Sequence, residues 1–509
     1  MALKQIEGTA ARETRPDAGT VWAARLSRLA ADWSAWALLI LVAGATFLHL
    51  FRLNRTSISP WDESIHAIVA QHVAQHPLQP TLFETAALVP NPPPNWALTH
   101  IWLHIPPFGI WTSALSLRLM GDTPFALRLP GVFFVGAGML VSYVLGRLLF
   151  GRVAGLTGAA FVGFAPYFLL LSQGYVFGDL TDTPLLLLTP LAFYCLIRGY
   201  RSGRLRWLVA AGGVEGLCYL CKAGIGVLPV LGALAALYVC EWVFPAEAGW
   251  RRLGLRGVVV VLGAAAVVAG PYTLYTDIAF PAIAKQEAHN WRVAIFGNYE
   301  NWGRPTDYHA TIYLYAQYGA ATALLLFGSV AVLALIAWRR RSRTDALVLA
   351  WILALYVPLT IAVTKAAPMT IAAAPAWGFA VARAVTVGLT ARSRLWRSAT
   401  LGALLGVGLL ALWFLAGHGT FAGPTISARL YKAAVPPVLT GFSRLARFAP
   451  LLTALGVCAL ATGICWLALR LVHPPAGSPR HIGARGTLLN GRALAIAAVA
   501  VALVGVGAT

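Results

Sequence analysis

The segment WALLILVAGATFLHLFRLNRTSISPWDE, residues 36–63, places a long apolar run shortly before an acidic pair, and the fold can be worked out from it. Residues 36–53 are apolar enough for a helix that crosses a bilayer, which takes about 20 mainly apolar residues. Polar residues follow, and Asp62 and Glu63 come soon after the point at which such a helix leaves the membrane. We therefore expect a membrane-spanning helix that leads into a loop with chemistry of its own.

The whole chain has the composition of a membrane protein. Its 509 residues are 59% hydrophobic and 11% charged, whereas a soluble domain is about 25% charged. The apolar content also excludes a disordered chain. We expect an all-α polytopic membrane protein with about 13 transmembrane helices. The apolar runs lie at 36–53, 131–149, 153–171, 183–198, 207–222, 225–243, 254–275, 311–338, 345–363, 367–383, 398–416, 448–470 and 488–508.

The net charge of +21 is explained by membrane orientation. With the N-terminus in the cytoplasm, 26 of the 39 Lys and Arg residues fall on the inner side of these runs, as the positive-inside rule requires. Basic loops beside the membrane also attract anionic lipid headgroups. Nucleic acid is not an expected partner, because the chain has no basic domain apart from these loops. We predict a multi-pass protein of the cell inner or plasma membrane.

The loops on the outer side are longer than those on the inner side. Three are large, 54–130, 276–310 and 417–447. Loops carry function when a rigid scaffold positions them, so we expect the active site on the extracytoplasmic face. The chain then divides into a cytoplasmic segment 1–35, a transmembrane core 36–383, and C-terminal transmembrane helices 384–509 with the outer loop 417–447.

The first outer loop carries an ordered series of motifs. Asp62-Glu63 opens an amphipathic stretch, 64–75, with apolar residues on one helical face. The stretch is too short and polar to span, so it and a second segment ending at Met120 are expected to lie in the interface. The remaining motifs are His104-Ile105-Pro106-Pro107, a turn at Gly121, and Arg128-Leu129-Pro130 at the start of the next span.

This series resembles the first outer loop of the glycosyltransferases that use polyprenyl-phosphate sugars. They include glycosyltransferase family 39, the protein O-mannosyltransferases and the lipid A aminoarabinose transferases. The resemblance implies the GT-C fold, with residues 36–383 as its catalytic core and interfacial helices in the first outer loop. One departure is His104, which stands where many members have Lys.

The resemblance continues downstream, well to about residue 240 and loosely over 340–380. Asp179 or Asp182, in the second outer loop, resembles the second acidic site of these enzymes, and the sequence does not decide between them. Lys222, in Leu220-Cys221-Lys222-Ala223-Gly224, resembles their Lys-Gly at the end of the fifth span. Lys365, in Thr364-Lys365, resembles their Ser/Thr-Lys segment, although the Tyr commonly found there is missing.

The implied reaction moves a sugar from a polyprenyl-phosphate donor to a lipid, polysaccharide or protein acceptor of the cell envelope, with inversion. The resemblance makes Asp62 the general base. Glu63, Asp179 or Asp182 could bind sugar hydroxyls, stabilise oxocarbenium character or hold a metal; no cofactor is certain, and a divalent metal is the candidate. Cations stabilise a departing phosphate. The candidates for substrate binding are His104, Arg128, Lys222, Arg292, Arg304, His309 and Lys365.

Each residue also has a purely structural interpretation. Asp62 and Asp182 could cap helices, Arg128 could pair with Asp122, and the two lysines could snorkel at span ends. For the whole protein, the alternatives are a ligase that uses a lipid-diphosphate glycan and a transporter or flippase. A transporter needs ionisable groups near the midplane, and Glu215 is the clearest acid inside a span. The charges gather in outer loops instead, which favours the enzyme.

Overall fold

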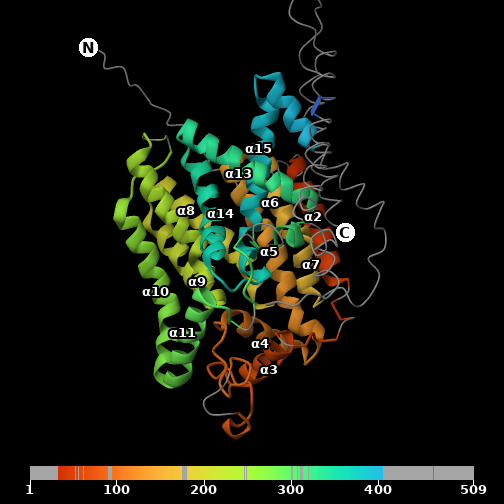
Figure 1. Ribbon diagram of the computed structural model, residues 1–509, viewed down its shortest axis with the longest axis vertical. Coiled ribbons are helices and arrows are strands. Elements are labelled where there is room, and N and C mark those ends of the chain that lie inside the picture. The colour runs from red at the N-terminus through yellow and green to blue at the C-terminus, as the bar shows by residue number, and fades with distance from the viewer. Residues whose placement is uncertain are drawn as a thin grey trace, which may run out of the picture.

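The computed structural model describes residues 32–404, with short gaps, and residues 462–463 (Figure 1). The gaps are residues 52, 55–56, 61, 90–94, 175–179, 246, 248, 300–301, 307, 310–312 and 319. Nearly all of the N-terminal segment 1–35, the loop 417–447 and the predicted runs at 448–470 and 488–508 lie outside the described residues. Where the structure describes the chain, it is helical, with two isolated bridges, Thr81–Ile101 and Gly303–Thr364.

The helices follow the predicted apolar runs closely. Six are long and apolar enough to cross a membrane, or seven if the bent pair α6–α7 is one span. The count covers only the described residues, so thirteen stays a prediction. The α-helices are α2 (Trp33–Leu50), α3 (Asp62–Gln75), α4 (Phe108–Met120), α5 (Pro124–Phe150), α6 (Arg152–Phe164), α7 (Pro166–Ser172), α8 (Leu185–Ser202), α9 (Leu205–Val243), α10 (Gly254–Ala279), α11 (Pro281–Phe296), α12 (Leu314–Tyr318), α13 (Ala320–Arg340), α14 (Arg343–Ile361) and α15 (Ala374–Thr390). Three 3₁₀ turns join them: η1 (Ala86–Leu88), η2 (Leu180–Asp182) and η5 (Ala367–Ala373).

Three of the predicted spans are shaped by two breaks in the helices. The third bends by 45° between α6 and α7, where Ala165 is extended and Pro166 has no backbone N–H to continue the ladder. The fifth and sixth predicted runs meet inside α9, where Lys222 (φ −144°, ψ 34°) and Ala223 (φ 45°, ψ −131°) are not helical.

The break in α9 reverses the chain direction. A Cβ added at Gly226 would clash with the carbonyl oxygen of Cys218, whereas eight residues of a continuous helix would separate the two by about 12 Å. Glycine is therefore needed at position 226 for the close approach. The first half of α9 contains Glu215, which is 1% exposed and whose carboxylate oxygens meet no hydrogen-bond partner in the part of the chain that the structure describes.

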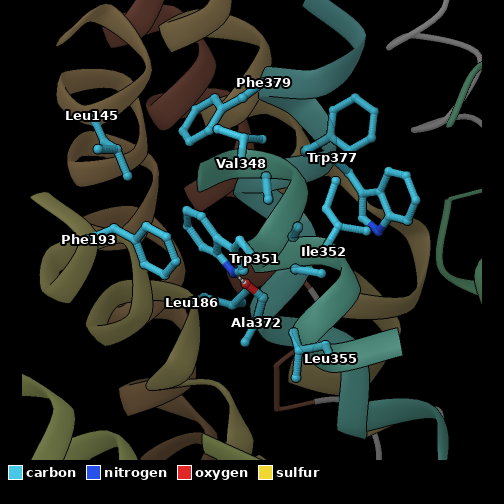
Figure 2. Close-up of a cluster of buried hydrophobic side chains, with 14 of the residues drawn as sticks. Leu145, Leu186, Phe193, Val348, Trp351, Ile352, Leu355, Ala372, Trp377 and Phe379 are labelled. Atoms are coloured by element: carbon cyan, nitrogen blue, oxygen red, sulfur yellow. Dashed lines mark hydrogen bonds between the residues drawn. The ribbon is translucent and has the colours of Figure 1, made fainter. Parts of the chain in front are cut away.

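The main hydrophobic core joins α8, α14 and α15 around Trp351 (Figure 2). The Trp351 ring stacks on Phe193 of α8, with centroids 3.9 Å apart, and meets Phe379 of α15 edge-on at 6.2 Å. Its indole N–H donates to the carbonyl of Ala372 in η5, at 3.0 Å. This core fixes η5, and with it the chain that immediately precedes η5 and carries Lys365.

The first outer loop folds as a separate layer at one end of the bundle, where Figure 1 shows α3 and α4 together. Its own core contains Val69 of α3, Ile110 of α4 and the tryptophans Trp96 and Trp102, all buried. The two helices predicted in this loop are confirmed as α3 and α4. Gly109 of α4 lies against Thr181 of η2, so the layer is seated on the loop before α8.

Candidate active site

A buried ion pair fixes the start of α3. The Arg128 guanidinium donates from Nε to Glu63 Oε1 at 2.6 Å and from Nη2 to Glu63 Oε2 at 2.9 Å. Both residues are at most 3% exposed. Arg128 also donates to the carbonyls of Leu53 and Ser57, at 2.9 and 3.0 Å, so it joins the end of α2, the start of α3 and α5. The expected alternative partner, Asp122, is exposed instead.

Asp62 is placed by this pair. It is the first residue of α3 and precedes Glu63, and its side chain is only partly buried. A helix N-terminus favours negative charge because the backbone N–H groups of the first turn have no intrahelical acceptors. Asp62 therefore lies at the start of a braced helix, with its side chain partly exposed.

A second buried ion pair joins η2 to the break in α9. Lys222 Nζ lies 3.0 Å from Asp182 Oδ1, and the two side chains are 6% and 0% exposed. Lys222 therefore does not snorkel, and Asp182 does not cap α8, whose N-cap position is Pro184. Asp179 lies outside the described residues, so the choice between the two aspartates remains open.

His104 forms a contact that the sequence did not predict. Its Nδ1 lies 3.1 Å from Oε2 of Glu287, a side chain of α11 that is 6% exposed. The imidazole stacks on Trp96, with centroids 4.4 Å apart and planes at 16°, and faces Tyr299 at 6.4 Å. The first outer loop is thus tied to α11, a helix of the large outer loop.

Lys365 and His309 are both fully buried in a neighbouring part of the site. Lys365 Nζ donates to the carbonyls of Leu359 at 2.8 Å, Thr360 at 3.1 Å and Ala362. These groups end α14, where a cation complements the helix dipole. Burial, aided by the charge of Lys365, lowers the pKa of His309 to about 3. His309 is therefore neutral at ordinary pH, and within the described part of the chain its ring nitrogens have no hydrogen-bond partner.

The two arginines of the large outer loop are less enclosed. Arg292 is exposed on α11 and donates to the carbonyl of Ala288, one turn earlier, at 3.2 Å. Arg304 lies over the Trp302 ring, 5.5 Å from its centroid. The structure does not place either arginine in one of the buried ion pairs.

Some segments that carry sequence-predicted residues contact one another at this end of the bundle. Within this end the large outer loop packs on the segment before η5: the Thr364 hydroxyl accepts from Tyr299 N–H at 3.0 Å and donates to the Gly297 carbonyl at 3.1 Å. The backbone N–H of Lys365 donates to the Trp302 carbonyl at 3.1 Å. Glu287 is the residue that sequence reasoning missed. Its only sequence signal is an acid in a polar outer loop, and nothing there indicates that it faces His104.

A metal cluster is not evident in the part of the chain that the structure describes. No three His, Cys, Asp or Glu side chains come together there as ligands. The buried carboxylates Glu63 and Asp182 each have a cationic partner.

Comparisons with known proteins support the predicted resemblance. Residues 104–273 match the family described as dolichyl-phosphate-mannose-protein mannosyltransferase. ArnT from Cupriavidus metallidurans bound to undecaprenyl phosphate is similar in structure, with a TM-score of 0.60 and 17% identity over 94% of this chain and 77% of that one. Apo ArnT from the same organism gives 0.56 and 19%, over 97% and 77%. No curated protein gives a significant match.

These findings define the class of the protein. The structural likeness, at low identity, shows the GT-C fold. The fold and the family match together confirm the resemblance predicted from the first outer loop. The chain is a membrane glycosyltransferase of the kind that uses a polyprenyl-phosphate-linked sugar.

Proposed function

We propose that this chain transfers a sugar from a polyprenyl phosphate to an acceptor hydroxyl or amine on the extracytoplasmic face, with Asp62 as general base. The observation that carries the proposal is the position of Asp62, at the N-terminus of α3, next to the buried Glu63–Arg128 pair. A base must be held within hydrogen-bonding reach of the proton that it takes. A partly buried carboxylate on a braced helix meets that need.

The proposed step is a single displacement. The acceptor atom attacks the anomeric carbon while its proton passes to the Asp62 carboxylate, and the bond between that carbon and the phosphate oxygen breaks. The lipid phosphate leaves as an anion, and attack from the opposite side inverts the configuration. A fixed positive charge near the departing oxygens lowers the barrier.

The donor class is supported by the fold and by the cations at this end of the bundle. The ArnT structure of the same fold was solved with undecaprenyl phosphate. In this chain, the Lys222 ammonium and the His104 imidazole are the proposed phosphate contacts, with Arg292 and Arg304 from the large outer loop. The buried Asp182 and Glu287 then serve to orient Lys222 and His104, and Glu63 orients the remaining candidate, Arg128. His309 and Lys365 are proposed to line the same region.

The decisive experiment uses purified enzyme in nanodiscs with a panel of polyprenyl-phosphate sugars. We expect turnover by the wild type with at least one donor, and a loss of at least about 100-fold in Asp62→Asn, the usual scale of acid–base catalysis. Asp122→Asn, which changes an exposed carboxylate of the same loop, should retain activity. Full activity in Asp62→Asn would remove this residue from the mechanism.

The side of the membrane and the stereochemistry need separate measurements. A cysteine introduced at the exposed Gln71 of α3 should react with a membrane-impermeant maleimide in intact cells. A cysteine at the exposed Arg252, between α9 and α10, should react only after lysis. The anomeric configuration of the product, read by NMR, should be opposite to that of the donor.

A further inference from the structure

A buried arginine lies at the end of the bundle opposite the candidate active site. Arg343 is the first residue of α14, and α14 extends about 28 Å before it reaches the segment that Lys365 caps. The arginine is 1% exposed and is among the largest fully buried side chains. Its guanidinium Nε and Nη2 are buried and have no hydrogen-bond partner among the residues that the structure describes. An unpaired buried guanidinium is costly, so this position calls for an anion.

The acidic side chains nearby are committed to other groups. Glu247 accepts from the backbone N–H of Arg343 at 2.9 Å. Asp345, two residues further along α14, pairs with Arg383 at 2.8 and 3.2 Å. Glu241 accepts from the N–H groups that begin α10. Among the described residues, no carboxylate lies within hydrogen-bonding distance of the Arg343 guanidinium.

The surroundings concentrate positive potential on this point. Side chains in a helix lean toward its N-terminus, so Arg343 leans toward the turn between α13 and α14, the positive end of the α14 dipole. The same turn carries Arg341, whose guanidinium lies 4.6 Å from the centroid of the Trp338 ring and 5.7 Å from that of Phe244. Arg339 and Arg340 precede it and are exposed.

Two tryptophans place this arginine cluster at the depth of lipid headgroups. Trp338, in the last turn of α13, is 64% exposed, and Trp242, at the end of α9, is 77% exposed. Exposed tryptophans at the ends of membrane helices mark the interface between hydrocarbon and water. An anion that reaches Arg343 at this depth comes most readily from a lipid.

We propose that Arg343, with Arg341, binds the phosphate group of an anionic phospholipid. The guanidinium Nε and Nη2 form a planar pair of donors that matches two phosphate oxygens. The exposed Arg339 and Arg340 supply long-range attraction that favours a net negative headgroup. The lipid bridges α9, α13 and α14, at a site that is separate from the proposed chemistry.

The test titrates delipidated, detergent-purified full-length protein with phosphatidylglycerol, phosphatidylcholine or inorganic phosphate, and follows binding by native mass spectrometry. We expect phosphatidylglycerol to bind the wild type at least about tenfold more tightly than Arg343→Gln, because the variant loses charge-assisted hydrogen bonds to the phosphate. Arg341→Gln, at a half-exposed position, should also weaken binding. The control Arg339→Gln should change it far less.

Three results would overturn the proposal. The first is that phosphatidylglycerol binds the wild type, Arg341→Gln and Arg343→Gln with equal affinity. The second is that the wild type binds phosphatidylcholine as tightly as phosphatidylglycerol. The third is that inorganic phosphate competes for the site as well as the lipid does. If Arg343→Gln does not fold, Arg341→Gln and the lipid comparison in the wild type decide the outcome. Sugar transfer does not enter the readout, so the result is independent of the proposed function.

Discussion

Two cations at the same end of the bundle, Arg128 and Lys365, are both fully buried, yet the protein compensates their charges differently. Arg128 forms a two-pronged pair with the Glu63 carboxylate, whereas Lys365 donates to carbonyls that end α14. Breaking a buried ion pair costs about 3–5 kcal/mol, while a cation at a helix C-terminus contributes up to about 2 kcal/mol. Equal burial therefore does not mean equal dependence of the fold on the charge.

The largest effect is expected at Arg128. Arg128→Met leaves the Glu63 carboxylate buried without its counter-charge, so we expect a loss of about 3–5 kcal/mol in stability and an inactive enzyme. Thermal unfolding in detergent and a transfer assay measure the two effects. Arg118→Met, which removes an exposed arginine from α4 in the same loop, is the matched control and should behave like the wild type.

A double variant sharpens this comparison. Glu63→Gln combined with Arg128→Met removes both charges, so it should unfold at a higher temperature than Arg128→Met alone. If the double variant is no more stable than the single one, the cost arises from lost packing or from the bonds of Arg128 to Leu53 and Ser57 rather than from the unpaired carboxylate.

A smaller effect is expected at Lys365. Lys365→Met removes the cation from the end of α14, and we expect a loss of up to about 2 kcal/mol with little change in the KM for the donor. Lys285→Met, at an exposed site on α11, is the control. A large rise in KM with an unchanged unfolding temperature would instead show that Lys365 contacts the donor phosphate, as the family resemblance suggests.

The sequence predicted which chain segments form the site better than it predicted the contacts within it. The runs of apolar residues located the helices, because length and hydropathy decide membrane insertion. The loss of regular structure near Lys222 was visible as a gap between two runs. The partner of Arg128 could not be predicted from the sequence. Asp122 and Glu63 are both plausible partners until it is known that the start of α5 packs against the start of α3.

His104 shows the same limit more clearly. Its position in the His-x-Pro-Pro motif was evident from the sequence, but Glu287 lies 183 positions away and follows several spans. A contact at that separation depends on how the helices pack. Lys365 differs again, because its carbonyl partners are within six residues of it in the sequence. These contacts still require the chain to turn back after α14. That turn depends on η5, which a hydrogen bond from Trp351 holds in place.

At neutral pH the smallest effect concerns His309, the buried neighbour of Lys365, because its contribution to stability changes only as the pH falls. Its pKa is about 3 in the folded protein, against 6.5 for an ordinary histidine. At a pH between these two values, the unfolded chain therefore binds a proton that the folded protein does not bind. Where the unfolded state holds more protons, stability falls as pH falls. His309 should therefore contribute a loss of up to about 1.4 kcal/mol in stability per pH unit as the pH drops below about 6.5.

His309→Gln should flatten the dependence of the unfolding temperature on pH between pH 6.5 and 4. His289→Gln, which changes an exposed residue on α11, should not. An unaltered slope in His309→Gln would mean that folding does not lower the pKa of this imidazole, which would contradict the contrast between a neutral histidine and a capping lysine.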